Sequence, residues 1–226
     1  KNIKPGSGIG SSAASAAGTV AGINYLLGNP FTNKELIPFA MEGERLACGT
    51  AHADNVAPAL LGGFTLVRDT DPLDICALPT PLELVATVIH PKIEVKTADA
   101  RAVLKKRVTL EKAISQWGNV GALVSSLYEE DYELLSRSLV DVIVEPARSI
   151  LIPYFKELKV ACKEEGALGS GISGSGPSVF ALSRGMSSAV NVAQAMKSVL
   201  ENTNIPFDIH VSPVKKTGVS FIEDLT

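Results

Sequence analysis

The stretch Pro5-Gly6-Ser7-Gly8-Ile9-Gly10-Ser11-Ser12-Ala13-Ala14-Ser15 decides the fold expected for this chain, because a glycine-rich loop runs directly into small residues that suit a helix. Glycines at alternating positions let the backbone adopt positive φ and approach a ligand closely. Ser11 and Ser12 stand where a helix would begin, so backbone amides and the positive end of the helix dipole would face the loop. Such a loop binds anions, and a triphosphate is the ligand we expect. The alternative interpretation is a plain Gly/Ser turn followed by an N-capped helix.

Three better-known phosphate motifs do not fit this stretch. A P-loop is excluded because no Lys-Ser or Lys-Thr pair follows the last glycine. A Rossmann G-x-G-x-x-G pattern fails at Ser11. A protein-kinase glycine loop lies in a hairpin, whereas residues 13–17 favour a helix. The pattern that remains, Pro followed by Gly-Ile-Gly-Ser-Ser-Ala-Ala-Ser, resembles the ATP loop of the GHMP small-molecule kinases. That family usually has Leu where Ile9 stands, and the resemblance implies that residues 5–15 bind ATP.

Composition excludes several classes of partner. The chain has 226 residues, is 46% hydrophobic and carries a net charge of −3, so it can bury one large core or two modest ones and has no polyanion-binding signature. We therefore expect no nucleic-acid partner. Its three cysteines are far apart and lack C-x-x-C spacing, which argues against a disulfide framework or zinc site and favours a reducing compartment, the cytoplasm or a plastid stroma. The longest apolar tract, residues 13–27, is too interrupted to span a membrane. Because the chain opens without Met just before the loop, we expect further sequence ahead of Lys1.

Hydrophobic periodicity and turn residues predict an α+β fold, since helices and strands alternate without a regular βαβ rhythm. A break at residues 79–81 suggests two domains, 1–80 and 81–226. We expect residues 51–63 to be irregular, Asn33 to cap the second helix, and Gly18 and Gly22 to allow close packing of the first. The helices are predicted at 13–27, 34–49, 99–112, 117–127, 132–144, 150–165 and 187–200. The strands are predicted at 64–67, 82–89, 179–182, 207–211 and 219–222. The residues that spacing assigns to the core are Leu36, Ile37, Ala40, Leu46, Ala47, Trp117, Val120, Val124 and Leu127.

A second glycine run, residues 169–178, contains G-x-G-x-x-G but follows a predicted helix and precedes a predicted strand, the reverse of the Rossmann order. One interpretation is a flexible turn. The other is a backbone-lined loop that packs against the first glycine run and closes over the phosphates. Its wording, Gly-Ile-Ser-Gly-Ser-Gly-Pro-Ser, resembles the third GHMP motif, which implies ATP contacts at Gly174, Ser175 and Gly176.

A triphosphate is normally bound with a divalent metal that takes a few protein oxygens as ligands. Ser12 and Glu44 are the candidate ligands for Mg²⁺. Taken alone, the sequence favours Glu44 as a solvated helix charge or a partner of Arg45 over a metal ligand. The resemblance favours the metal role, because the family's metal carboxylate lies eight residues before the histidine of its second motif, and Glu44 lies eight residues before His52.

The second motif runs from His52 to Phe64 and has the form H-x-D-N-x-x-P with a following Gly-Gly-Phe. Within the GHMP kinases, this sequence pattern resembles that of the homoserine kinases in particular. It implies that His52 and Asn55 contact the substrate, and that Asn55 acts with Ser12 and Glu44 in catalysis. An amide cannot accept a proton, so catalysis would depend on positioning and charge neutralisation, with the γ-phosphate or water taking the proton. We interpret the other histidines, His90 and His210, as structural.

Two arginines indicate what kind of substrate the chain binds. Arg101 follows Thr97 at a strand-to-helix turn, and Arg148 lies at a Pro-kinked junction. Each could be a surface salt bridge, but at such junctions an arginine can offer a planar fork to a carboxylate. The wording T-x-x-A-R and E-P-x-R resembles the homoserine kinase segments that hold the substrate carboxylate, which implies a substrate site containing Thr97, Arg101 and Arg148.

The resemblance as a whole implies ATP-dependent phosphorylation of L-homoserine on the route to threonine. It implies a two-domain GHMP fold, with a left-handed βαβ crossover in the N-terminal domain and a ferredoxin-like C-terminal domain, and it allows a homodimer. It also implies that the family's leading segment, with residues for the substrate amine and hydroxyl, is absent from residues 1–226. Two alternatives remain: a GHMP kinase for another hydroxy amino acid or an isoprenoid alcohol, and a non-catalytic module that senses nucleotide.

Overall fold

The computed structural model describes residues 3–95 and 97–222, and these divide into two compact units. The sheet unit contains the chain up to Ile9 together with Pro81–Val214. The helix unit contains Gly10–Thr80 together with the chain from Lys215 onward. Each unit has its own core of buried apolar side chains. In the described part of the chain, no helix has the length and apolar character needed to cross a membrane.

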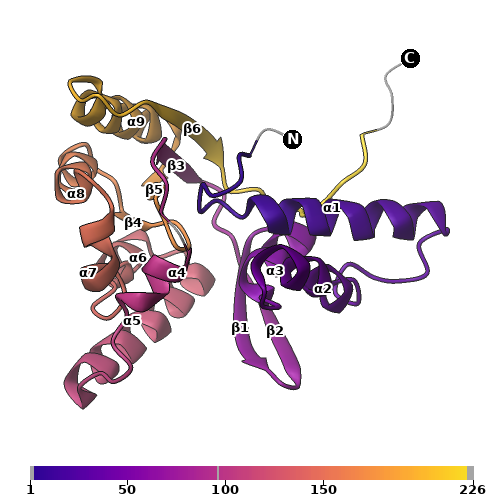
Figure 1. Cartoon of the computed structure of the whole chain (residues 1–226). Coiled ribbons are helices and arrows are strands. Elements are labelled where there is room, and N and C mark those ends of the chain that lie inside the picture. The colour runs from indigo at the N-terminus through magenta and orange to yellow at the C-terminus, as the bar shows by residue number, and fades with distance from the viewer. Residues whose placement is uncertain (1–2, 96, 223–226) are drawn as a thin grey trace. The chain divides into compact units, whose positions relative to one another are not determined.

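The helix unit consists of three packed helices and a hairpin, labelled in Figure 1. The helices are α1 (Ser11–Leu26), α2 (Ile37–Cys48) and α3 (Ala53–Leu61), and the antiparallel strands are β1 (Phe64–Thr70) and β2 (Leu73–Leu78). Small residues dominate the buried side of α1, which brings the helices close together. The prediction that residues 51–63 are irregular is wrong. Pro58 removes one backbone N–H from α3, but Val56, Ala57 and Leu60 are fully buried, and that burial stabilises the helix.

Three details of the helix unit differ from expectation. Helix α2 begins at Ile37, and Asn33 does not cap it, because its amide nitrogen donates to the carbonyl oxygen of Leu60 instead. Leu46 and Ala47 are exposed rather than in the core, so only the first turns of the predicted stripe are buried. The predicted closing strand at 219–222 is absent from the described residues. Val219 instead donates its N–H to Ala59.

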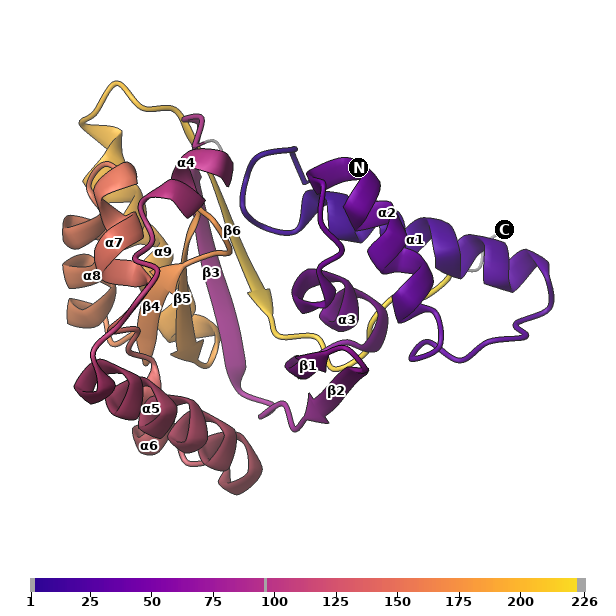
Figure 2. The ribbon, with the colours of Figure 1, turned by 60° about the horizontal axis from the view of Figure 1, so that its bottom comes forward.

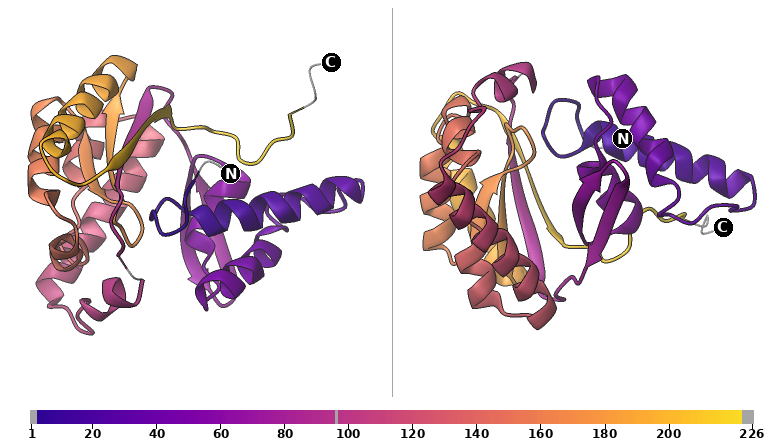
Figure 3. Two further views of the ribbon diagram at one scale, coloured as in Figure 1. Left: turned by 45° about the horizontal axis from the view of Figure 1, so that its top comes forward. Right: turned by 90° about the horizontal axis from the view of Figure 1, so that it is seen from below.

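The sheet unit is built on a four-stranded antiparallel sheet with the order β4-β5-β3-β6. The strands are β3 (Leu84–Pro91), β4 (Gly169–Ile172), β5 (Val179–Arg184) and β6 (Phe207–Pro213). Counted within this sheet the order is 2-3-1-4, the order of a ferredoxin-like sheet. Helices α8 (Phe155–Glu164) and α9 (Met186–Glu201) pack side by side on one face of the sheet (Figures 2 and 3). Their buried residues, such as Leu158 and Met196, form the core with Ile89 and Val179.

The remaining helices of the sheet unit are α4 (Thr97–Ala102), α5 (Leu110–Glu129), α6 (Tyr132–Ser138) and α7 (Glu145–Arg148), with a 3₁₀ turn at Ser149–Leu151. Of these helices, α4 and α6 are shorter than predicted, α5 is longer, and α7 was not predicted. The predicted helix 99–112 is wrong because Thr109 starts a new helix by accepting a hydrogen bond from the N–H of Lys112. The predicted helix 132–144 ends early because the Asp141 carboxylate accepts bonds from the N–H groups of residues 143–145.

Helix α5 contains the least expected side chains of the fold. Trp117 and Val120 were predicted in the core, but they are 65% and 41% exposed. Val124 is partly buried, and Leu127 alone of this group is fully buried. Their helical spacing identified the helix correctly but not which part of its apolar face the molecule covers.

Candidate active site

The first glycine run adopts the backbone conformation that its sequence predicts. Gly6, Gly8 and Gly10 have φ of 75°, 77° and 78°, a region that residues with a Cβ atom rarely occupy. Helix α1 begins directly afterwards at Ser11, with Gly10 at its N-cap position and no acidic residue in its first turn. The positive end of the α1 dipole is therefore not compensated by a carboxylate from that turn. This is the geometry of an anion-binding loop.

Within the sheet unit the two glycine runs interlock. A Cβ atom on Gly8 would lie 2.6 Å from the carbonyl oxygens of Ser173 and Gly176, and one on Gly174 would lie 2.9 Å from the carbonyl oxygen of Gly8. The Ser173 hydroxyl donates to the Gly8 carbonyl at 2.8 Å. The glycines are thus required for close contact between the two loops rather than for flexibility. This agrees with the interpretation that residues 169–178 pack against the first glycine run.

A buried histidine supports this interlock. The hydroxyl of Ser178 lies 2.5 Å from the carbonyl oxygen of Ser7 and 3.2 Å from Nδ1 of His90. A hydroxyl has one proton to donate, and the carbonyl can only accept, so Nδ1 of His90 must carry the proton that completes the chain. Burial lowers the pKa of His90, which favours the neutral ring. Sequence reasoning identified His90 as structural and left it outside the site, and no spacing signal connects it to residue 178.

Glu44 is buried in the helix unit with one carboxylate oxygen unpartnered. Its side chain is 4% exposed, and its Oε1 atom has no hydrogen-bond partner among the described residues. Arg45 pairs with Glu42 instead, so the alternative roles of Glu44 as a solvated charge or a partner of Arg45 do not fit. A buried carboxylate with an open oxygen fits a divalent cation. No cluster of three or more His, Cys, Asp or Glu side chains suited to a metal occurs among the described residues, so other ligands would have to come from hydroxyls, phosphate or water.

The glycine before Glu44, which the sequence analysis did not single out, lies at a close contact between two helices. A Cβ atom on Gly43 would lie 2.8 Å from Cβ of Ala16, so Gly43 permits the close approach of α2 to α1. The same role was expected of Gly18 and Gly22, and that prediction is wrong, because a Cβ atom on either would meet nothing within 4 Å. Ser12, the other proposed metal ligand, is partly buried in the first turn of α1.

The second motif lies at the start of α3. His52 occupies the N-cap position, is exposed, and has its Nε2 atom 2.8 Å from the Thr50 hydroxyl. Asn55 is also exposed, and its Oδ1 atom would be 3.4 Å from a Cβ atom on Gly10. The helix unit therefore places the Asn55 amide beside the N-terminus of α1.

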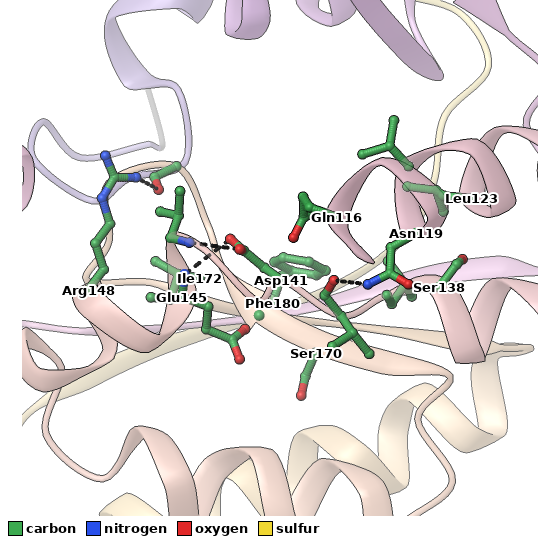
Figure 4. A pocket seen from close by; sticks show the side chains of 16 residues that line it. Gln116, Asn119, Leu123, Ser138, Asp141, Glu145, Arg148, Ser170, Ile172 and Phe180 are labelled. Atoms are coloured by element: carbon green, nitrogen blue, oxygen red, sulfur yellow. Dashed lines mark hydrogen bonds between the residues drawn. The ribbon is translucent and has the colours of Figure 1, made fainter. Parts of the chain in front are cut away.

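The two predicted substrate arginines are placed differently from each other. Arg148 is half-buried, and its Nε and Nη1 atoms donate to the carbonyl oxygens of Ala100 and Gly174 at 3.0 and 3.1 Å (Figure 4). It thus connects α4, which carries the exposed Arg101, with the second glycine run. Two of its N–H groups are already bonded to backbone, which fixes the plane of the guanidinium. The side chain of Thr97 lies outside the described residues.

A cavity of about 340 Å³ adjoins Arg148 in the sheet unit (Figure 4). Its walls come from α5, the segment 138–148, and strands β4 and β5. The side chains of Gln116 and Asn119 hold the backbone of Val142 and Val140, and Asp141 caps the following turn. Glu145 pairs with Lys159 at 2.5 Å. The polar groups of this cavity thus largely organise the segment that carries Arg148, and apart from Glu145 of the E-P-x-R pattern they were not predicted from the sequence.

Comparison with known proteins decides the family. Residues 1–63 match the family model described as GHMP kinases N terminal domain, and residues 123–202 match GHMP kinases C terminal. The curated homoserine kinase of Chloroherpeton thalassium is 51% identical over 96% of this chain and 69% of its own length. The chain belongs to the homoserine kinase family of the GHMP kinases. The homoserine kinase of Pyrococcus furiosus is 40% identical over 95% of the chain and 71% of its own length.

Solved structures agree with this family assignment. The crystal structure of homoserine kinase from Cytophaga hutchinsonii has a TM-score of 0.94 at 56% identity, over 96% of this chain and 69% of that one. Mevalonate kinase of L. major, solved in complex with R-mevalonate, has a TM-score of 0.71 at 19% identity, which shows a shared fold alone. The α+β two-domain GHMP fold is thus confirmed. For a member of the homoserine kinase family, ATP is the implied phosphoryl donor.

Proposed function

We propose that this chain transfers the γ-phosphoryl group of ATP to the side-chain hydroxyl of L-homoserine, giving ADP and O-phospho-L-homoserine for threonine synthesis. The observation that carries the proposal is the 51% identity to a homoserine kinase across nearly the whole chain. The bacterial relatives support a cytoplasmic location. The two family-model matches fall inside residues 1–80 and 81–226, which supports a domain boundary after Thr80. The compact units differ from these ranges at their ends, because the chain up to Ile9 belongs to the sheet unit and the chain from Lys215 to the helix unit.

The interlocked loops support the nucleotide site. We assign ATP contacts to Pro5–Ser15 and to Gly174, Ser175 and Gly176. Backbone amides in a loop held rigid by carbonyl contacts are already oriented when the phosphates arrive, so little reorganisation free energy is spent on binding. The open Oε1 atom of Glu44 and the Ser12 hydroxyl would hold Mg²⁺, which neutralises phosphate charge when bound.

We assign substrate contacts to His52, Asn55, Thr97, Arg101 and Arg148. The backbone bonds of Arg148 orient its planar fork, which suits a carboxylate. Asn55 would orient the reacting hydroxyl. The hydroxyl oxygen then bonds to the γ-phosphorus, the bond from that phosphorus to the β,γ-bridging oxygen breaks, and the hydroxyl proton passes to a phosphate oxygen or to water. Asn55 takes no proton, so its contribution is positioning.

The test is ADP release by the protein expressed from its complete gene, with L-homoserine, L-threonine and mevalonate as separate acceptors. We expect turnover with homoserine alone. Turnover with threonine or mevalonate but not homoserine would identify another GHMP kinase, and ATP binding without turnover would identify a nucleotide-sensing module.

In the same assay, Arg101→Ala should raise the KM for homoserine about tenfold or more, because a hydrogen bond to a charged group is worth about 1.5–3 kcal/mol. The KM for ATP should barely change, and the exposed Arg137→Ala is the matched control.

A further inference from the structure

The sheet unit contains a second cavity, of about 360 Å³, and among the described lining residues it shares only Val144 with the cavity beside Arg148. Its walls are the loop between α4 and α5, the first turn of α5, and the segment 143–147 that leads into α7. A cavity of this volume falls in the range that holds small molecules, about 300–1,000 Å³. The apolar residues that line it are Leu104, Val108, Ile143, Val144, Pro146 and Ala147.

The polar side chains of this second cavity are three cations and a hydroxyl. The cations are Lys105, Arg107 and Lys112, and no described residue of the lining is acidic. None of the three takes part in a salt bridge within residues 3–95 and 97–222. The Thr109 hydroxyl accepts a hydrogen bond from the N–H of Lys112, so its own proton can be donated to a ligand. The cavity therefore offers positive charge and hydrogen-bond donors.

This concentration of positive charge does not stabilise the fold. Lys112 lies in the first turn of α5, and Lys105 and Arg107 precede that helix, where the helix dipole is also positive. The first turn contains the carboxylate of Glu111, but Glu111 is not among the described residues that line the cavity. A bound anion would offset the repulsion between the cations, and the apolar walls would strengthen the attraction by excluding water.

We propose that the second cavity binds a phosphate monoester with an apolar substituent, and that its occupancy orders the two segments that carry Arg101 and Arg148. A phosphate monoester carries a charge of about −1.5 to −2 at pH 7 and has three acceptor oxygens. Arg107 can offer phosphate a planar fork, while the two lysines supply point charges. The apolar walls would contact the substituent, which inorganic phosphate lacks.

Backbone hydrogen bonds connect the cavity to both arginines. The N–H of Leu104, in one wall, donates to the carbonyl oxygen of Arg101 at 3.1 Å. The N–H of Arg148 donates to the carbonyl oxygen of Val144, in another wall, at 3.0 Å, and its Nε atom donates to the carbonyl oxygen of Ala100. A ligand that contacts both walls therefore limits the relative motion of the two arginines. That consequence rests on the proposed function, whereas binding in the cavity is independent of it.

Calorimetry with phenyl phosphate tests the binding. The titration uses the protein expressed from its complete gene, with Mg²⁺, the non-hydrolysable ATP analogue AMPPNP and L-homoserine all present, so that only a site outside the active site can respond. We expect a dissociation constant below about 1 mM, with inorganic phosphate and benzoate each binding about tenfold more weakly or worse. No binding of phenyl phosphate, or equally tight binding of either comparison anion, would overturn the proposal.

A charge-reversed variant locates the bound phenyl phosphate. The cavity variant, Arg107→Glu with Lys112→Glu, should weaken binding at least tenfold, whereas Lys156→Glu with Lys163→Glu, at exposed positions of α8, should leave it unchanged. Because carboxylates beside the start of α5 suit the helix dipole, the cavity variant should unfold at an equal or higher temperature than the unmodified chain. Loss of binding then does not reflect loss of the fold. Unchanged binding in the cavity variant would show that the second cavity is not the site.

Initial rates test whether occupancy orders the two arginines. At saturating ATP, a saturating concentration of phenyl phosphate should lower the KM for homoserine about twofold or more in the unmodified chain but not in the cavity variant, because a pre-ordered site spends less free energy on binding. A KM that stays unchanged, or that rises in both proteins as for a competitor in the active site, would contradict the ordering. If neither protein phosphorylates homoserine, the proposed function fails, and calorimetry alone decides whether the second cavity binds the ester.

Discussion

At the scale of single residues, Glu44 is the side chain whose burial the fold does not explain. Burying a carboxylate costs on the order of several kcal/mol unless hydrogen bonds or a cation compensate. Here one oxygen lacks a partner in the described structure, and the neighbouring Gly43 permits the close approach of α2 to α1. A bound cation, as proposed for this site, would supply the missing compensation.

This argument predicts the behaviour of Glu44→Gln. The amide is neutral, so the variant should unfold at an equal or higher temperature than the original when no metal is present. The further rise in unfolding temperature on adding Mg²⁺ with ATP should be largely lost, and the Mg²⁺ concentration for half-maximal activity should increase. Differential scanning fluorimetry measures the first two quantities.

Glu42→Gln is the matched control, because Glu42 lies on the same helix but is exposed and paired with Arg45. Its response to Mg²⁺ should equal that of the unmodified chain. If Mg²⁺ with ATP raised the unfolding temperature of Glu44→Gln as much as that of the unmodified chain, Glu44 would not be a metal ligand.

At the scale of elements, strand β3 supports both glycine loops through His90 and Ser178. His90→Leu removes the Nδ1 donor, so the Ser178 hydroxyl no longer has a fixed orientation toward the Ser7 carbonyl. We expect the KM for ATP to rise severalfold and the KM for homoserine to change little. The exposed His210→Leu on β6 is the control.

The pKa of His90 gives this prediction a second readout. Burial lowers that pKa below 6.5, although Asp208 acts in the opposite direction, and Lys4, Lys92 and His210 reinforce the lowering. A histidine with a depressed pKa contributes stability above pH 6.5 that is lost as the pH falls. Urea unfolding at pH 7.5 and 5.5 should therefore show a smaller loss in His90→Leu than in the original. If both proteins lost the same stability between pH 7.5 and 5.5 and the KM for ATP were unchanged, His90 would not support the glycine loops.

The individual elements show which structural features the sequence could predict and which it could not. Residues 5–15 predicted both the positive-φ loop and helix α1, because glycine spacing and a following run of small residues are local signals. Helix α3 was missed because Pro58 is a local signal for a break, whereas the burial of Val56 and Leu60 that stabilises it is a tertiary effect. The prediction that Trp117 is buried was wrong, because hydrophobic periodicity identifies the apolar face of a helix but not which part of that face the fold covers. The close contacts of Gly43 and the link from His90 to Ser178 join segments distant in the chain, which no local pattern records.

At the scale of the whole molecule, the chain passes between its two units after Ile9, Thr80 and Val214, and each unit has a separate core. Leu60 in the helix unit and Leu158 in the sheet unit are both fully buried, so each Leu→Ala change should cost about 2–5 kcal/mol. Because the cores are separate, Leu60→Ala should accelerate amide hydrogen exchange mainly in residues 10–80, and Leu158→Ala mainly in 81–214. Emission from Trp117, in the sheet unit, should follow unfolding of that unit alone. Equal acceleration throughout the chain in both variants would show instead that the two cores unfold as one cooperative structure.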